Sequence, residues 1–293
     1  MDIIEVFTRF PKQEDCLEYL EKVRWSKQPK CPYCKSENFT IMPKEHRYHC
    51  NKCNASYSVT VGTIFHKTHL ALQKWFLAVT IILNAKKGVS ARQLARDLKV
   101  NRNTAWRISM QIRNAMVQDE QRKLLTGVVE MDETYIGGKP RRGSGKEVHI
   151  KHKPGRGTDK TPVVGMVQRK GDVYAKVFKK SDLRLKKLSV LVREKVDTQN
   201  TILMTDKYPV YFGMSRILPH KSIDHSIWYV RGDCHTNTIE SFWALLKRGI
   251  VGQFHKVSLR HLHKYIDEFC YRQNHREHED VFGLTIQKAI GVA

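Results

Sequence analysis

The sequence predicts a mixed α/β fold that follows a small zinc-binding domain and a helical region. Two C-x2-C pairs lie near the N-terminus, residues 69–126 show helical apolar periodicity, and the remainder alternates strand-like and helix-like segments. Such alternation is typical of a sheet covered by helices, and not of a helical bundle. We therefore predict three regions, at 1–68, 69–126 and 127–293.

The first region contains four clustered cysteines, Cys31, Cys34, Cys50 and Cys53. Fifteen residues separate the two C-x2-C pairs, a spacing typical of structural Zn²⁺ sites. Each pair directs two thiolates at one point, and two pairs complete a tetrahedron. The strand-like segments FTIMP and RYHC between the pairs indicate a zinc ribbon, whose small core would depend on the metal for stability. The spacing disfavours the alternative of four free cysteines.

The second region predicts two helices joined by a short turn at Val100 and Asn101, with Ser90 as the N-cap of the first helix. This pattern fits a helix-turn-helix, in which the first turn of the second helix faces base edges or phosphates. The residues concerned are Arg102, Asn103 and Arg107. An ordinary helical hairpin remains the alternative, although the basic composition favours DNA binding.

The third region predicts a mixed sheet with covering helices. A strand-like run at 127–138 leads into a loop rich in Gly, Lys and Arg at 139–160. The further elements expected are hairpin strands at 161–168 and 173–178, a helix at 181–196 capped by Ser181 or Asp182, a strand at 201–212, and helices at 235–253 and 259–276.

The charge balance identifies the class of partner. Fifty-two Lys and Arg against 29 Asp and Glu give a net charge of +23, which nucleic acid is suited to neutralise. The N-terminus lacks the pattern of a signal peptide, and the most apolar window is shorter than the roughly 20 residues that span a bilayer. Seven cysteines, an odd number, do not suggest a secreted disulfide framework. We expect a cytoplasmic, nucleoid-associated protein with double-stranded DNA as partner and no membrane association.

Three acidic residues stand out in this basic chain. Asp132 and Asp206 lie near the ends of apolar, strand-like runs, where a charge is costly unless it is paired or binds metal. Glu240 lies on the predicted helix 235–253, beside its apolar face. Three carboxylates that converge from separate elements could hold two Mg²⁺ or Mn²⁺ ions. Two such ions promote in-line displacement at phosphorus.

Each acid also has a simpler interpretation. Asp132 could cap a turn, and Glu133 beside it is a competing candidate ligand. Asp206 could be a turn residue, since Asp favours turns. Glu240 could be an exposed acid that pairs with Lys247. The combination of all three in this order favours a metal site.

The cysteine cluster, the helical segment and the motifs MDETYIGGK, TDKYPVY and HTNTIESFWALLKRGIVGQFHKVS resemble the ISXO-like DDE transposases of bacterial insertion sequences. The resemblance covers nearly the whole chain. It implies a ribonuclease-H-like catalytic fold with Asp132 on the first strand and Asp206 on the fourth. The third ligand would lie on the following helix, where Asn237 and Glu240 both qualify. We predict Glu240 because a carboxylate supplies the charge that two Mg²⁺ ions need, with Asn237 in a supporting role.

The resemblance also implies that Lys247 contacts DNA phosphate beside the site, and we add Arg248, Arg141 and Arg142 to the predicted DNA-binding residues. The implied activity is hydrolysis at terminal inverted repeats, followed by attack of the freed 3′-hydroxyl on target DNA. A homodimer or larger assembly would process the two ends together. The alternatives are a nuclease of the same fold that only hydrolyses, and a non-catalytic zinc-ribbon and helix-turn-helix regulator, as in a domesticated transposase.

Overall fold

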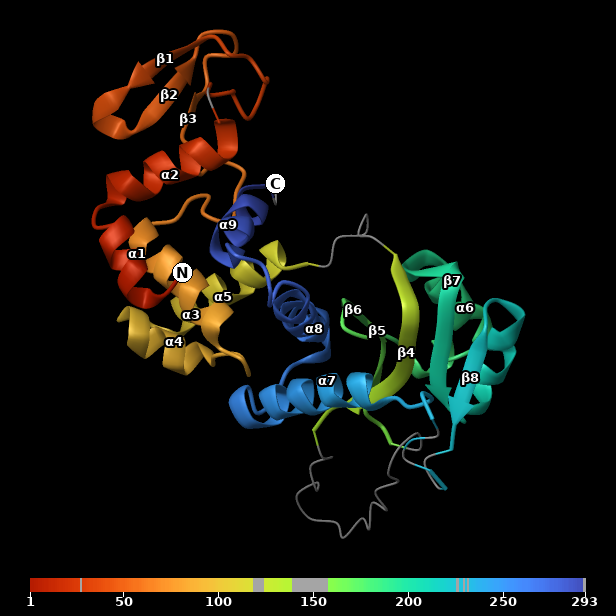
Figure 1. The fold of residues 1–293 in the computed structure, drawn as a ribbon. Coiled ribbons are helices and arrows are strands. Elements are labelled where there is room, and N and C mark those ends of the chain that lie inside the picture. Colours follow the sequence, from red (N-terminus) through yellow and green to blue (C-terminus); the bar gives the residue numbers. More distant parts are fainter. Residues whose placement is uncertain are drawn as a thin grey trace. The chain divides into compact units, whose positions relative to one another are not determined.

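The computed structural model describes residues 1–26, 28–117, 124–138, 158–224, 227–228, 230 and 232–291. The chain divides into two compact units, one made of residues 1–117 and 275–293 and the other of residues 118–274 (Figure 1). This division differs from the three predicted regions. The C-terminal helix α9 (Val281–Gly291) packs with N-terminal helices, and therefore does not belong with the sheet that precedes it in sequence.

The first unit combines a small sheet with a group of helices. The helices are α1 (Ile3–Arg9), α2 (Gln13–Trp25), α3 (Leu72–Asn84), α4 (Ala91–Leu98), α5 (Arg102–Ala115) and α9. Aromatic rings join them, since Phe76 makes edge contacts with both Phe10 and Phe282. Helix α4 follows Ser90, whose side chain accepts the Gln93 backbone N–H at 3.2 Å, which confirms the predicted N-cap.

The small sheet has three antiparallel strands in the order β1 (Phe39–Met42), β2 (Arg47–Cys50) and β3 (Ser56–Tyr57). The strands β1 and β2 coincide with the two segments predicted between the cysteine pairs. A minimal core of Cys31, Tyr48, Cys50 and Tyr57 lies beneath them. Two of these four residues are predicted zinc ligands, and the remaining packing comes from Tyr48 and Tyr57 with the partly buried Trp25 and Phe39. A core this small would depend on the metal for stability.

The second unit is built on a five-stranded mixed sheet in the order β6-β5-β4-β7-β8. Its strands are β4 (Leu125–Ile136), β5 (Thr161–Gln168), β6 (Val173–Val177), β7 (Val196–Asp206) and β8 (His220–Ile223). Strands β4, β5 and β6 are antiparallel neighbours, whereas β7 and β8 continue parallel to β4. Figure 1 shows β4, β7 and β8 side by side. This topology confirms the predicted ribonuclease-H-like class.

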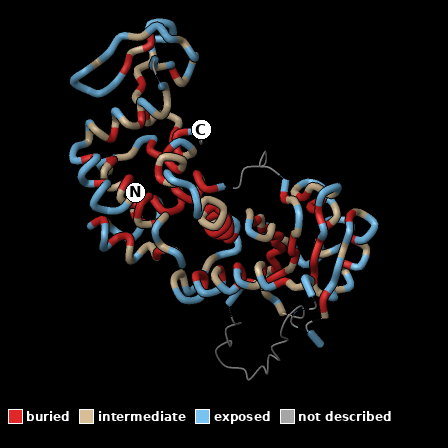
Figure 2. Tube along the Cα trace, in the orientation of Figure 1, coloured by how far each residue is buried: buried red, intermediate tan, exposed pale blue. Residues whose placement is uncertain are grey.

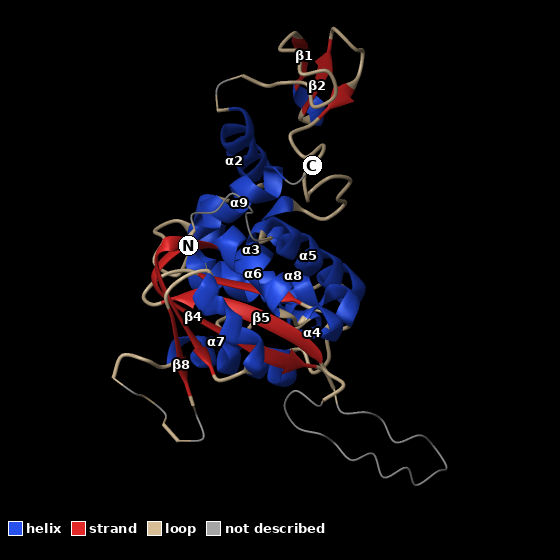
Figure 3. Cartoon of the chain, turned by 90° about the vertical axis from the view of Figure 1, so that its right-hand side faces the viewer, coloured by secondary structure: helices blue, strands red, loops and turns tan. Residues whose placement is uncertain are grey.

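Helices cover the sheet and bury its strands (Figures 2 and 3). They are α6 (Leu185–Lys195), α7 (Asn237–Arg248) and α8 (Leu259–Asn274). Helix α6 shares a buried apolar cluster with β4, β5 and β7. Helix α7 packs on β4 and β5, where a Cβ atom added at Gly165 would lie 2.5 Å from the Trp243 ring. Glycine at this position therefore lets α7 approach the sheet closely.

Several helices and strands begin or end at residues other than those predicted. Helix α6 begins after Arg184 without a side-chain cap, so the cap predicted at Ser181 or Asp182 is wrong. Strand β7 ends at Asp206, and a 3-10 helix (Pro209–Arg216) stands where the strand was predicted to continue. Proline has no backbone N–H and cannot donate a hydrogen bond to a neighbouring strand. The last predicted turn of α7 is a π-helix (Gly249–Gln253). Among the described residues, no helix is long and apolar enough to span a membrane.

Candidate metal centres

The four clustered cysteines meet at one point in the small sheet. Cys31 Sγ lies 3.7 Å from Cys53 Sγ, and Cys34 Sγ lies 3.4 Å from Cys50 Sγ. All four sulfur atoms lie within 4.8 Å of one another. Zn–S bonds of about 2.3 Å in a tetrahedron give S···S separations of about 3.8 Å. Both the donor set and its size therefore fit a structural Zn²⁺ ion.

Hydrogen bonds within this cluster favour ionisation of one of its thiols. Burial acts to raise the pKa of the Cys50 thiol. However, hydrogen bonds from the backbone N–H groups of Cys53 and Lys52, together with those from the Cys34 and Cys53 thiols, lower this pKa to about 6. These two N–H groups belong to the tight turn that follows Cys50. The backbone N–H of Ala55 acts to lower the pKa of Cys53, but burial and the neighbouring thiols raise it to about 12. A thiol that ionises readily is a better zinc ligand, because the thiolate is the form that binds.

The predicted catalytic acids Asp132 and Asp206 are brought together by two parallel strands. Met131 on β4 is in register with Thr205 on β7, so the next residue of each strand carries a carboxylate at the same edge. Carboxylate oxygens of Asp132, Glu133 and Asp206 lie within 4.8 Å of one another. Oxygen ligands grouped in this way suit Mg²⁺ or Mn²⁺.

Asp132 is held in a site that resists its ionisation. Trp243 Nε1 on α7 donates a hydrogen bond to Asp132 Oδ2 at 3.1 Å. Burial, then repulsion from Glu133 and Asp206, raises the pKa of Asp132 to about 7, and Glu240 adds a smaller contribution. A divalent cation between these groups would relieve the repulsion. The electrostatics therefore favour a cation among the carboxylates.

Glu133 has a different environment from its neighbour. Alternation along β4 directs residues 132 and 133 to opposite faces of the sheet. Tyr211 donates its hydroxyl to Glu133 Oε2 at 2.7 Å. Burial, followed by repulsion from Glu133, raises the pKa of Tyr211 well above its usual value, so the phenol remains a donor. One oxygen of Glu133 is thus already engaged in a structural hydrogen bond.

Glu240 lies on the first turn of α7, outside the group formed by Asp132, Glu133 and Asp206. Its Oε1 accepts the hydroxyl of Thr236 at 2.8 Å. Because Glu240 raises the pKa of Asp132, the two carboxylates lie within electrostatic range of each other. Asn237 is the exposed first residue of α7. Lys247 and Arg248 are exposed in its last turn.

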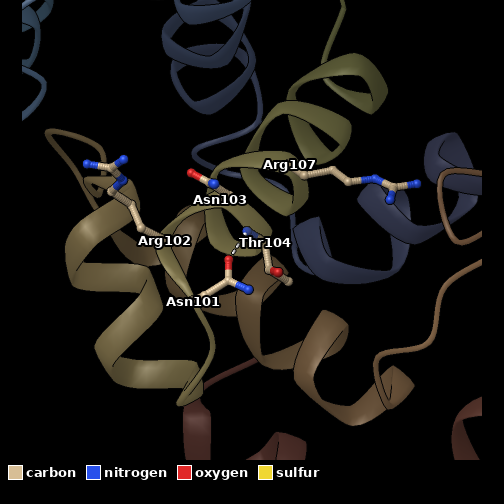
Figure 4. A pocket seen from close by; sticks show the side chains of 5 residues that line it. All are labelled: Asn101, Arg102, Asn103, Thr104 and Arg107. Carbon is tan, nitrogen blue, oxygen red and sulfur yellow. Dashed lines mark hydrogen bonds between the residues drawn. The ribbon is translucent and has the colours of Figure 1, made fainter.

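The predicted helix-turn-helix residues lie at the start of α5. Asn101 caps this helix, since its side chain accepts the Thr104 N–H at 2.8 Å. Arg102, Asn103 and Arg107 line an open depression with these two residues, and Figure 4 shows the two guanidinium groups extending in different directions. All three predicted side chains are exposed and polar. Arg141 and Arg142 lie outside the described residues.

The raised pKa of Asp132 predicts pH-dependent metal binding. Below pH 7 the carboxyl is mostly protonated and must release its proton to bind a cation, whereas above pH 7 it is already ionised. We expect Mn²⁺ affinity to be about tenfold weaker at pH 6 than at pH 8, as one released proton requires. Calorimetry in buffers of different ionisation enthalpy would measure this release. In Asp132→Asn the release should disappear; equal affinity at both pH values in the wild type would contradict the prediction.

Comparison with known proteins finds two transposase domain families and a protein of a transposable element. Residues 124–274 match the family described as ISXO2-like transposase domain, and residues 11–56 match the transposase zinc-ribbon domain. An uncharacterized protein in transposable element ISH50 of Halobacterium salinarum is 28% identical over 90% of this chain and 92% of its own. The Mos1 strand transfer complex has 13% identity and a TM-score of 0.31, covering 74% of this chain and 75% of that one. The Mos1 mariner paired end complex with Mn has 14% identity and a TM-score of 0.31, covering 73% and 75%.

Proposed function

Since the chain belongs to the ISXO2-like transposase family, we propose that it is a DNA transposase that cuts at the ends of an insertion sequence and joins them to target DNA. The convergence of Asp132 and Asp206 from two parallel strands is the observation that carries this proposal. A carboxylate group of this kind in a chain of charge +23 fits phosphodiester chemistry on a polyanion.

The side chains of this site have separate tasks in the proposed reaction. Asp132 and Asp206 would hold two divalent cations, which activate the attacking oxygen and stabilise the leaving oxygen when bound. Trp243 keeps one oxygen of Asp132 in a fixed direction. Water would attack first, and the freed 3′-hydroxyl would then attack a target phosphodiester in the same site. No Ser, Tyr or Cys nucleophile is required.

We propose Glu240 as the third ligand, although Glu133 is closer to the two aspartates in this structure. Helix α7 packs on the same face of the sheet as Asp132, as the Trp243 hydrogen bond shows. Glu133 starts on the opposite face and is tied to Tyr211. Glu240 Oε1 accepts the hydroxyl of Thr236 at the start of its own helix, a neutral donor that a cation can replace. Asn237, one turn earlier, would support it.

A comparison of three variants tests this assignment. We expect Glu240→Gln to lower metal-dependent cleavage of a DNA end by about a hundredfold or more, since it removes a charged ligand, and Asn237→Ala by about tenfold. Glu133→Gln can still accept from Tyr211 and should lose less activity than Glu240→Gln. Single-turnover cleavage with Mg²⁺ would measure each rate, with melting temperatures as a control for folding. Full activity in Glu240→Gln would exclude Glu240 and favour Glu133.

DNA recognition would use exposed groups of both units. Arg102, Asn103 and Arg107 would read or hold the terminal repeats together with the zinc ribbon. Lys247 and Arg248 would hold phosphates beside the carboxylates, and Arg141 and Arg142 remain predicted contacts. Because two ends must be processed together, a homodimer or larger assembly on DNA in the cytoplasm is part of the proposal.

A further inference from the structure

Glu130 is a fully buried carboxylate that is not among the proposed metal ligands. It lies two residues before Asp132 on β4, and the strand's alternation gives both residues the same face. Its Oε2 accepts the backbone N–H groups of Thr238 at 2.8 Å and Ile239 at 3.0 Å. Its Oε1 accepts the Thr238 hydroxyl at 3.0 Å. The central strand is thus bonded directly to the first turn of α7.

Arg169, which follows β5, completes this connection. Its Nε donates to Glu130 Oε1 at 2.7 Å, which neutralises the buried charge. Its two terminal nitrogens donate to the backbone carbonyls of Asp233 at 2.9 Å and His235 at 3.0 Å. One guanidinium group therefore fixes both the carboxylate and the segment that leads into α7.

The first turn of α7 depends on this carboxylate. The first N–H groups of a helix have no partner within the helix and are usually capped by a local side chain. Thr236, at the N-cap, does not accept a backbone N–H with its side chain, and its hydroxyl donates to Glu240. Glu130 supplies the missing acceptor from 108 residues earlier in the chain, and its charge suits the positive end of the helix.

A second contact fixes the helix along the strand. Trp243 on α7 donates to Asp132, as described above. Glu130 therefore holds the start of α7 while Asp132 holds Trp243 further along the same helix. These two contacts together restrict movement of α7 relative to β4.

We propose that Glu130 and Arg169 are positioning residues that hold the first turn of α7, and with it Glu240, on the face of the sheet that carries Asp132. They act through the first turn of α7 and do not touch the reacting atoms. The assignment of Glu240 as a ligand rests on the proposed function, whereas the contact between Glu130 and α7 does not. Loss of Glu130 should therefore loosen α7 first and weaken cation binding as a consequence.

The test compares Glu130→Gln with Glu268→Gln in the full chain. Glu268 is an equally buried carboxylate that is bonded to Arg272 on α8, so it controls for the loss of a buried ion pair. We expect amide hydrogen exchange over residues 236–243 to be at least about tenfold faster in Glu130→Gln than in wild type, and unchanged in Glu268→Gln. The Mn²⁺ concentration for half-maximal cleavage should rise by about tenfold to a hundredfold in Glu130→Gln only.

A milder substitution controls for the possibility that Glu130→Gln unfolds the protein as a whole. Thr238→Val removes one hydroxyl donor to Glu130 and should shift both measurements in the same direction, by about two- to fivefold. Arg169→Lys, which keeps the charge but loses the forked contact to two carbonyls, should fall between wild type and Glu130→Gln. Equal exchange and equal Mn²⁺ requirement in the two glutamine variants would overturn the proposal. If wild type shows no metal-dependent cleavage, the proposed function fails, and the exchange comparison still decides whether Glu130 holds α7.

Discussion

Asp132→Asn should abolish metal-dependent DNA cleavage, by about a thousandfold or more, which is the scale on which loss of an essential catalytic group acts. Asp132 stands on the central strand, next in space to Asp206, and no neutral amide can supply its charge to two cations. Binding of DNA should stay within about threefold, because the proposed phosphate contacts are basic side chains outside the carboxylate group. Cleavage of an end-bearing duplex and fluorescence anisotropy would measure the two effects.

The same substitution should make the metal-free protein more stable at pH 8. The folded-state pKa of Asp132 is raised to about 7, above the usual value of about 3.9. The folded state therefore binds the extra proton between these values, and its stability falls as pH rises towards 7. Asparagine carries no such cost, so we expect the melting temperature at pH 8 to rise by about 3 °C or more, and added Mn²⁺ to stabilise wild type only.

Asp182→Asn provides the control, because Asp182 lies on the 3-10 helix Lys180–Asp182 and is not part of the carboxylate group. It should retain the wild-type cleavage rate and response to Mn²⁺. Unimpaired cleavage in Asp132→Asn would remove this residue from catalysis. Wild-type protein that binds DNA but never cuts would instead favour the non-catalytic regulator.

The predictable parts of this molecule are those with local signals. Asp132 and Asp206 can be identified from the sequence because a charge at the end of an apolar strand is costly unless it is paired or binds metal. The two cysteine pairs have the spacing that is typical of a zinc site. Ser90 stands directly before a segment with helical apolar periodicity, which predicts an N-cap. Helix α1 was not predicted, although the sequence carries a signal for its start. Asp2 and Glu5 form a capping box there.

The remaining parts depend on contacts between distant segments. Nothing near Glu130 in sequence indicates that it caps a helix 108 residues later. Nothing near α9 indicates that it packs with α2, α3 and α5. The approach of Glu133 to the aspartates is a matter of side-chain conformation, which alternation along a strand does not specify. For this reason the choice of third ligand needs variants as well as geometry.

Cys50→Ser should unfold the zinc ribbon while the five-stranded sheet stays folded. The ribbon's buried core is Cys31, Tyr48, Cys50 and Tyr57, and two of these four are predicted zinc ligands. Loss of the metal would leave mainly the aromatic contacts of Tyr48 with Phe39 and Tyr57 to hold the strands together. Structural zinc contributes about 10–16 kcal/mol to folding in small zinc-finger peptides, far more than the few aromatic contacts of this small core can replace. We expect zinc content to fall from one ion per chain to near zero, and proteolysis to cut within residues 28–60.

Cys270→Ala is the matched control, because Cys270 is buried on α8 and belongs to the other unit. It should keep its zinc, its resistance to proteolysis within the ribbon, and its affinity for DNA ends. Cys50→Ser should lose that affinity by about tenfold or more at constant salt, if the ribbon takes part in recognition as we propose. Retained zinc in Cys50→Ser would contradict the four-thiolate site. Lost zinc with unchanged affinity would confirm the site and assign recognition to α5 and the rest of the basic surface.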